Sequence, residues 1–372
     1  MKYSLSLLAL CLAVVPSIAD TTQPLKPVPG SSRSAPAAPA SPTHFTFALS
    51  GDNRSTGRNV PQPPTADQIF AEIRLLQPEF TLWTGDVIYG SDDTVGEAES
   101  EYDLFLASVA KSNTPLYNAP GNHEIFERAE LASLYEAKMG RLYGSFDYGN
   151  SHFIAVDTEE VGAKGGISKA QMDWLRQDLT ANRGAAHIFA FMHHPLYPKD
   201  SKEGFTDLTV RDALHKLFVE FGVKNVFSGH EHLFYKSEHD GITYWISGGG
   251  GAPSSESPVE GGFQHYMLIT VDGDAVTTTI LEPWRLFTKV GPPDATGAQT
   301  ALVTNYHPVS LPVYIDFPGD TVSPVVTAAA VYKGKTVPLE ATIVPSRSRG
   351  VVTVRVIVPK GRGATVTLRS KS

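Results

Sequence analysis

Five short clusters of polar residues, each placed where an apolar segment ends, constrain the fold of this 372-residue chain more than any other feature. The apolar segments before them, such as 45–49 and 80–83, have the character of buried strands. Strands alternate with helical patterns through most of the chain, and open α/β folds place their sites where strands end. The sequence therefore predicts an α/β architecture, with sheets flanked by helices and a polar site at the strand ends. The clusters are Gly51-Asp52-Asn53-Arg54, Gly85-Asp86-Val87-Ile88-Tyr89, Gly121-Asn122-His123-Glu124, Met192-His193-His194-Pro195 and Gly229-His230-Glu231-His232.

Hydrophobic periodicity predicts the elements between these clusters. Thr65 and Gln68 have the spacing of a capping box at a helix start, and Ser168 is placed to cap another helix. The acidic and aromatic stretch 92–102 allows two interpretations, a cover over the site mouth or a solvated loop. Strands are expected at 45–49, 80–83, 115–117, 144–148, 152–156, 188–192, 226–228, 233–237, 242–246, 267–271 and 276–281, and helices at 65–76, 102–109, 126–139, 168–179 and 210–221.

The first residues have the pattern of a targeting segment. Lys2, the apolar run 5–15 and the small side chains of Ser17 and Ala19 predict a secretory signal peptide over residues 1–19. The run is too short to be a membrane anchor, because a spanning helix needs ~20 apolar residues. We therefore expect a secreted or periplasmic product without a transmembrane segment.

Composition divides the rest of the chain into three parts. Residues 20–43 are rich in Pro, Ala and Ser and predict a linker that buries no apolar surface. Residues 44–290 form the main domain, and residues 291–372 predict a small all-β module. Residues 312–372 include nine basic and three acidic side chains. This module could bind a polyanion, but a docked structural module with scattered surface charge is the interpretation we favour.

The donor types in the five clusters limit the cations they can hold. The clusters offer carboxylates, an amide, imidazoles and a phenol, while the single cysteine, Cys11, lies in the predicted signal peptide. Such a set suits Fe, Mn or Zn, and it excludes copper(I) and iron–sulfur clusters. Two such ions ~3.5–4 Å apart can clamp a phosphoryl group. A formal net charge of −8 argues against a nucleic-acid partner for the chain as a whole.

In this order, the motifs GD, GD, GNHE, HH and GHxH resemble those of the calcineurin-like metallophosphoesterase superfamily. The resemblance covers residues 44–283 and implies a four-layer fold (α+β), in which a β-sandwich is flanked by helices. Many members have a His two residues after the first Asp, where this chain has Arg54, whose guanidinium cannot ligate a cation. Purple acid phosphatases also lack that His and use a Tyr three residues after the bridging Asp, a spacing that Tyr89 has from Asp86. The chain thus resembles the branch that includes purple acid phosphatases.

The resemblance also implies roles for individual residues. The bridge between two metal ions would be Asp86, and His123 would stabilise the transition state or protonate the leaving oxygen. Arg54 would hold a phosphate oxygen, and His194 would lie just outside the metal ligands. The ligands of one ion would be Asp52, Tyr89 and His232, and those of the other Asn122, His193 and His230. The ions would be divalent or trivalent, iron paired with Fe, Zn or Mn, because a phenolate favours Fe(III).

Several of these assignments have an alternative. Tyr89 could be a packing residue at a strand end, and Arg54 could form a structural salt bridge. His194 could replace His193 as the ligand. We expect Glu124 to support a histidine rather than to react. The stretch 248–251 could border a substrate pocket, although a simple loop is the favoured interpretation.

The predicted function is that of an exported, metal-dependent phosphoric ester hydrolase. Its substrates would be small phosphate monoesters, which a metal-bound hydroxide attacks. A phosphodiesterase is the second hypothesis, and a non-catalytic binding protein on the same scaffold is the third.

Overall fold

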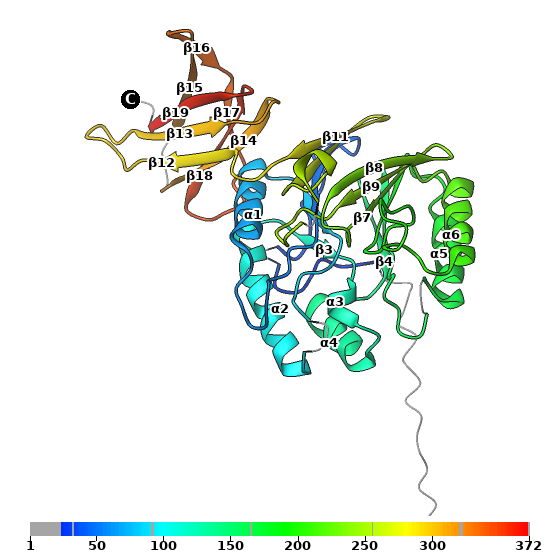
Figure 1. Cartoon of the computed structure of the whole chain (residues 1–372). Coiled ribbons are helices and arrows are strands. Elements are labelled where there is room, and N and C mark those ends of the chain that lie inside the picture. The colour runs from blue at the N-terminus through cyan, green and yellow to red at the C-terminus, as the bar shows by residue number, and fades with distance from the viewer. Residues whose placement is uncertain are drawn as a thin grey trace, which may run out of the picture.

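Two mixed β-sheets packed face to face form the centre of the larger part of the molecule (Figure 1). The computed structural model describes residues 24–31, 33–90, 93–163, 166–254, 256–319 and 323–370. In spatial order, the first sheet contains β11 (Ala275–Leu281), β10 (Tyr266–Asp272), β1 (His44–Ser50), β2 (Phe80–Trp83) and β3 (Leu116–Asn118). The second contains β4 (Gly144–Tyr148), β5 (Ser151–Ala155), β6 (His187–Phe191), β7 (Asn225–Ser228), β9 (Ile242–Ser247) and β8 (Phe234–His239).

The core between the two sheets is largely aromatic. In β1, Phe45, Phe47 and Leu49 belong to the cluster between the sheets, whereas Ala48 belongs to the cluster on the other face. This alternation follows from the two-residue period of a strand. The ring of Phe47 lies 5.3 Å from that of Phe153 on the second sheet, at an interplanar angle of 86°. Such edge-to-face pairs add to the apolar burial that holds the sheets together.

Helices cover the outer faces of both sheets, which gives four layers. Helices α1 (Pro64–Leu76) and α2 (Val95–Val109) share a buried cluster with the first sheet. Helices α5 (Lys169–Ala181) and α6 (Leu208–Phe221) do the same on the second sheet. The predicted fold class, an α+β sandwich in four layers with a further all-β part, is therefore confirmed. The shorter helices are η1 (Ala110–Ser112), α3 (Asn122–Ile125), α4 (Ala129–Met139) and η2 (Pro258–Glu260).

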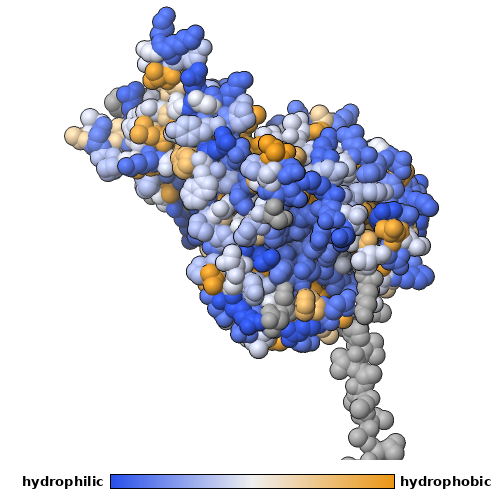
Figure 2. All heavy atoms as spheres, viewed as in Figure 1, coloured by the Kyte–Doolittle hydropathy of each residue, from blue (hydrophilic) through white to orange (hydrophobic). Residues whose placement is uncertain are grey.

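On the face shown in Figure 2, hydrophilic residues predominate and hydrophobic residues are scattered over the terminal sheets and the main domain. None of the helices in the described part of the chain is both long and apolar enough to cross a lipid bilayer.

Residues 286–370 form two further sheets, which lie beside α1 (Figure 1). Most of their buried hydrophobic residues belong to the same cluster as those of α1 and α2. The Arg74 guanidinium lies 2.9 Å from the Asp316 carboxylate. The strands are β12 (Leu286–Val290), β13 (Gln299–Asn305), β19 (Arg362–Ser370), β15 (Pro324–Tyr332) and β16 (Lys335–Leu339) in one sheet, and β14 (Leu311–Pro318), β18 (Val351–Val358) and β17 (Ala341–Val344) in the other.

Strand pairing and burial add detail at both ends of the main domain. β12 pairs with β13, so the terminal sheets already include residues 286–290, which the sequence assigned to the main domain. The expectation that the Pro-rich segment buries no apolar surface is wrong at Leu25 and Val28, which are 5% and 2% exposed. Their backbone N–H groups donate to Ser145 in β4 and to Leu116 in β3, the edge strands of the two sheets. This segment therefore covers edges that would otherwise expose unpaired backbone groups. The division into domains stays a prediction.

Two of the helix starts differ from those that the sequence predicts, and a third agrees. Helix α1 begins at Pro64, its cap is Pro63, and no side-chain hydrogen bond caps it, so the predicted Thr65–Gln68 capping box is wrong. Proline is favoured in the first helical turn because an N–H group at that position has no intrahelical acceptor, so its absence costs nothing. Helix α2 begins at Val95, seven residues earlier than predicted, with a capping box between Thr94 and Glu97. Within the described residues, the stretch 92–102 is therefore mostly helix rather than loop. The predicted Ser168 cap of α5 is confirmed.

Candidate metal centre

The five polar clusters meet because parallel strands bring their carboxyl ends to one rim. β1, β2 and β3 run parallel in the first sheet, and β5, β6 and β7 run parallel in the second. Hydrogen bonds then join the loops, both between the two sheets and within the second sheet. The His230 backbone N–H donates to Asp52 Oδ1 at 2.9 Å, and the Gly229 N–H donates to the His193 carbonyl at 3.0 Å.

The backbone at this rim is strained. Asp52, Asp86 and His230 have φ values of 56°, 54° and 70°, in the left-handed region that non-glycine residues rarely occupy. Such outliers persist where the surrounding contacts hold them, and they concentrate at functional sites. Two glycines permit the close approach of the loops: a Cβ at Gly229 would lie 2.2 Å from Asp52 Oδ2, and one at Gly121 would lie 2.3 Å from Asp86 Oδ1.

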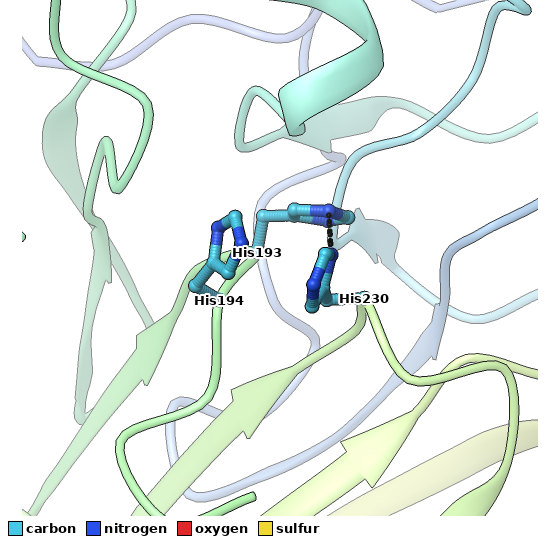
Figure 3. Close-up of side chains that lie close together, drawn as sticks. All are labelled: His193, His194 and His230. Carbon is cyan, nitrogen blue, oxygen red and sulfur yellow. Dashed lines mark hydrogen bonds between the residues drawn. The ribbon is translucent and has the colours of Figure 1, made fainter. Parts of the chain in front are cut away.

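One group of donor atoms converges on the side chain of His193. Its Nε2 lies 2.9 Å from Asn122 Oδ1, 3.3 Å from Asp86 Oδ1 and 3.2 Å from His230 Nδ1. Asn122 Oδ1 also lies 3.0 Å from His230 Nδ1. Figure 3 shows the imidazoles of His193 and His230 directed toward one another. Around an ion ~2.1 Å from each ligand, ligands at right angles lie ~3.0 Å apart, so these spacings fit a metal ion.

Outer hydrogen bonds decide which ring nitrogens face this centre. His193 Nδ1 lies 2.7 Å from the Thr84 carbonyl, and because a carbonyl only accepts, Nδ1 carries the proton and Nε2 presents a lone pair. His230 Nε2 lies 3.0 Å from the Glu203 carboxylate, which leaves the Nδ1 lone pair inward. Lone pairs that face one another without a proton repel, and a cation between them reverses that repulsion.

A second group consists of Asp52, Asp86 and His232, each of which offers one atom within 4.8 Å of the others. His232 Nδ1 donates to the Pro253 carbonyl at 2.9 Å, so its Nε2 lone pair lies inward, 3.8 Å from Asp52 Oδ1. Asp52 is fully buried, and its Oδ2 has no hydrogen-bond partner among the described residues. A buried carboxylate oxygen without a partner is costly unless a cation is close by. The donors present therefore fit the two metal ions that the sequence predicts.

Burial sets the charge of the site. It lowers the pKa of His193 and His232, and together with the neighbouring imidazoles of His194 and His193 it lowers that of His230 to about 2. All three imidazoles are therefore neutral, the form that ligates metals. Burial alone would raise the pKa of Asp86, but attraction to the protonated forms of His193, His123 and His230, which exist only in acid, lowers it to about 2. Burial and the charge of Asp86 raise the pKa of Asp52.

The predicted catalytic residues do not lie together. Arg54 Nε and His123 Nε2 each lie 3.9 Å from Asp86 Oδ2, so both face the shared carboxylate. His194 lies on the other side of the donor group, with its ring centroid 3.9 Å from that of His230 and its Nδ1 2.5 Å from Glu159 Oε1. Among the two adjacent histidines, it is thus His193 that contacts Asn122 and Asp86.

The structure gives less support to Tyr89 as a ligand. Its ring lies beside that of His123, with centroids 6.4 Å apart, and its backbone carbonyl contacts His123 Nδ1. The described residues show no hydrogen bond to the Tyr89 hydroxyl, in contrast to the other predicted ligands, whose side chains contact one another. The roles of all these residues stay predictions.

Two carboxylates hold the loop of Asp86: Glu124, whose partners differ from those expected, and Glu101, which the sequence does not indicate. Glu124 accepts the N–H groups of Asp86, Val87 and Ile88 at 2.8, 2.8 and 3.2 Å. Glu101, on α2, accepts the next two, those of Tyr89 and Gly90, at 2.8 and 3.2 Å.

Five consecutive backbone donors of this loop are thus held by two side chains. The described contacts of Glu124 are to backbone N–H groups, so the expectation that it supports a histidine is wrong. The predicted helix began only at Tyr102, so it did not include Glu101. The capping-box spacing of Thr94 and Glu97 indicates the earlier start.

Comparison with known proteins agrees with this architecture. The family model of the calcineurin-like phosphoesterases matches residues 43–234, more than half of the chain. The serine/threonine-protein phosphatase CPPED1 of Rattus norvegicus is 29% identical over 168 residues, which cover 42% of this chain and 54% of that protein. Purple acid phosphatase 15 of Arabidopsis thaliana is 28% identical over 163 residues, covering 38% of this chain and 30% of its own. The chain thus matches about half, or less, of the length of these relatives.

Among solved structures, purple acid phosphatase PPD1 from yellow lupin superposes with a TM-score of 0.55 at 17% identity, covering 67% of this chain and 53% of its own. That likeness concerns the fold alone. The family match and the curated relatives confirm the predicted superfamily and its resemblance to purple acid phosphatases, and they support the predicted enzyme class of metal-dependent phosphoric ester hydrolases. The chain belongs to the calcineurin-like phosphoesterase family.

Proposed function

We propose that this chain hydrolyses small phosphate monoesters with two metal ions bound at the strand ends. The observation that carries the proposal is the convergence of His193 Nε2 and His230 Nδ1 lone pairs with Asp86 Oδ1 and Asn122 Oδ1, all within 3.3 Å of His193 Nε2 or of each other. Residues that serve only in turns and helix caps would not be expected to place four such atoms around one point.

We assign one ion to the group of Asn122, His193 and His230, and the other to Asp52, His232 and Tyr89. Asp86 is shared, because its Oδ1 lies 3.3 Å from His193 Nε2 and one of its carboxylate oxygens lies within 4.8 Å of donor atoms of Asp52 and His232. When bound, two such ions activate water and neutralise the charge of a phosphoryl group.

The side chains on the Asp86 Oδ2 side would handle the substrate. Arg54 has five N–H donors in a planar fork, which suits the oxygens of a phosphate. Its Nε is buried and has no hydrogen-bond partner among the described residues, so a donor remains available for a ligand. His123 Nδ1 is held by the Tyr89 carbonyl, which directs Nε2 toward the same region, where the protonated imidazole can give its Nε2 proton to the leaving oxygen.

Metal analysis and turnover test this proposal together. We expect about two metal ions per metal-replete chain, and hydrolysis of p-nitrophenyl phosphate faster than that of bis-p-nitrophenyl phosphate. His230→Ala should lose metal and activity, whereas His44→Ala, which removes an exposed histidine paired with Asp272, should keep both. Faster turnover of the diester would favour a phosphodiesterase, and metal binding without turnover of either ester would favour a binding protein.

The proposal of iron at the Asp52 site has its own test. A phenolate bound to Fe(III) produces a visible charge-transfer absorption, so iron-loaded protein should be coloured and Tyr89→Phe should lose the band. Iron-loaded protein without such a band would reject Tyr89 as a ligand. Zn or Mn in the second position would be read from the same metal analysis.

Export is proposed on the sequence pattern alone. Residues 1–19 lie outside the described part of the chain. Expression of the full chain in a bacterial host should yield an extracytoplasmic product that begins at Asp20, which mass spectrometry would identify. An uncleaved product confined to the cytoplasm would contradict the signal-peptide hypothesis.

A further inference from the structure

A cavity of about 410 Å³ opens beside the donor atoms of the candidate metal centre. Asn122, His194 and His230 line the side nearest the centre, and Phe126 and Phe205 line other parts of the wall. The volume lies within the range of ~300–1,000 Å³ that is usual for small-molecule sites. A phosphate held at the centre would therefore have its substituent next to this space.

Phe126 occupies an unusual position on this wall. It directly follows the short helix α3, and its backbone N–H donates to the Asn122 carbonyl at 3.0 Å. Its φ is 46° and that of Glu127 is 55°, so two successive non-glycine residues adopt the left-handed conformation, which is unfavourable for a bulky side chain. The Phe126 side chain is nevertheless 52% exposed. An aromatic ring held in a strained backbone, yet not buried, gains its packing only when something occupies the cavity.

We propose that this cavity receives the alcohol portion of the substrate and that this portion carries an uncharged aromatic ring. The inference rests on the proposed hydrolysis of phosphate monoesters. A ring in the cavity would contact Phe126 and Phe205, and aromatic pairs of this kind contribute beyond the apolar area they bury.

The acidic side chains at the cavity disfavour a second anionic group. Glu127 and Glu159 line it, and Glu203, which precedes the lining residue Gly204, accepts a hydrogen bond from His230. Glu159 already has a partner, because its Oε1 lies 2.5 Å from His194 Nδ1. Glu127 contacts only the Gly162 backbone N–H among its described partners, so its charge faces any substituent in the cavity.

Two esters whose leaving alcohols are nearly equal in basicity test the ring preference. Metal-loaded protein should hydrolyse benzyl phosphate with a kcat/KM at least about tenfold above that of ethyl phosphate. Phe126→Ala should bring the two values close together by lowering only that of benzyl phosphate. Phe287→Ala, the same change at a partly exposed Phe on β12, should leave the ratio unchanged. A wild-type ratio near one, or a ratio unaffected by Phe126→Ala, would overturn the proposal.

The charge preference is read with 4-carboxybenzyl phosphate. It should be a poorer substrate than benzyl phosphate, and Glu127→Gln, which keeps an oxygen for the Gly162 N–H, should reduce that difference several-fold. An equal effect of Glu127→Gln on both esters would refute the role of this carboxylate.

Binding of phosphonates separates this proposal from the proposed activity, because their C–P bond is not hydrolysed. Calorimetry should show benzylphosphonate binding at least about tenfold more tightly than ethylphosphonate to metal-loaded protein, with the difference lost in Phe126→Ala. Selective binding without turnover of any ester would reject the hydrolase and retain the cavity. Turnover of the esters without selective binding would retain the hydrolase and reject the proposed role of the cavity. Absence of turnover and of selective binding would refute the two proposals together.

Discussion

Replacement of Glu124 by glutamine tests whether the loop of Asp86 is held by a carboxylate. In the native chain, Oε2 accepts the N–H groups of Gly121 and Asp86 at 2.6 and 2.8 Å, and Oε1 accepts those of Val87 and Ile88 at 2.8 and 3.2 Å. Burial and the charge of Asp86 raise the pKa of Glu124 to about 8, although the N–H groups of Gly121, Val87 and Asp86 act in the opposite direction. Because all four contacts of the side chain are N–H donors, which favour the carboxylate, we infer that it is ionised despite its burial.

A glutamine at this position has one acceptor oxygen and one NH2 group. Whichever way the amide points, two backbone N–H groups lose their acceptor and face another donor. Each buried donor left without a partner costs ~1–3 kcal/mol, so Glu124→Gln should lower the free energy of unfolding by about 3 kcal/mol. The same change loosens the loop that carries Asp86, and the loss of such outer support typically weakens metal binding by about 10- to 100-fold.

Urea unfolding and metal titration measure these two effects. Glu130→Gln is the matched control, since Glu130 is exposed and pairs, among the described residues, with Arg128 on the surface, a kind of contact that contributes little to stability. A Glu124→Gln variant within about 0.5 kcal/mol of wild type, with unchanged metal affinity, would refute the reasoning. Glu124 would then be a neutral acid that glutamine can imitate.

Three further changes test other parts of the structure. Asn122→Ala removes the oxygen between two imidazoles and should abolish turnover and lower metal content while the urea midpoint stays near that of wild type; retained turnover would contradict its role as a ligand. His152 bridges Asp147 and Asp178, and although burial lowers its pKa, these hydrogen bonds raise it overall. Its contribution to stability should be complete below the unfolded pKa of ~6.5 and lost at higher pH. His152→Gln should therefore lower the free energy of unfolding more at pH 5.5 than at pH 8.5, and an equal loss at the two pH values would exclude this linkage. Leu25→Ala should cost ~2–4 kcal/mol, since Leu25 is buried against both sheets, whereas a true linker residue would cost almost nothing.

The polar clusters could be located from the sequence because their placement follows from the strands alone. A parallel strand such as β2 must deliver the residues after Trp83 to the same rim as its neighbour β1. The two sheets then bring Asp86 and His193 within 3.3 Å of one another, which the order of motifs anticipates without any distance.

The supporting contacts could not be predicted in this way, because they depend on which segments meet in space. Glu101 lies on α2, and nothing in its local sequence indicates that it accepts the N–H groups of Tyr89 and Gly90. The segment around Leu25 has the composition of a linker, and its burial depends on two sheet edges formed by residues 116–118 and 144–148. The composition of a segment indicates whether it can form a core by itself. It does not indicate whether another part of the chain provides a surface against which the segment packs.

These supports imply that the metal centre is formed before metal arrives. The N–H groups of five consecutive residues, 86–90, are accepted by side chains of α2 and α3, so the loop has its partners whether or not an ion is bound. This differs from small metal-dependent domains, which fold only with their ion. We therefore expect chelation to leave the circular dichroism spectrum unchanged and to lower the melting temperature by an amount that depends on free metal concentration, as mass action requires. Loss of helical signal on chelation would show instead that the ions organise the strand ends.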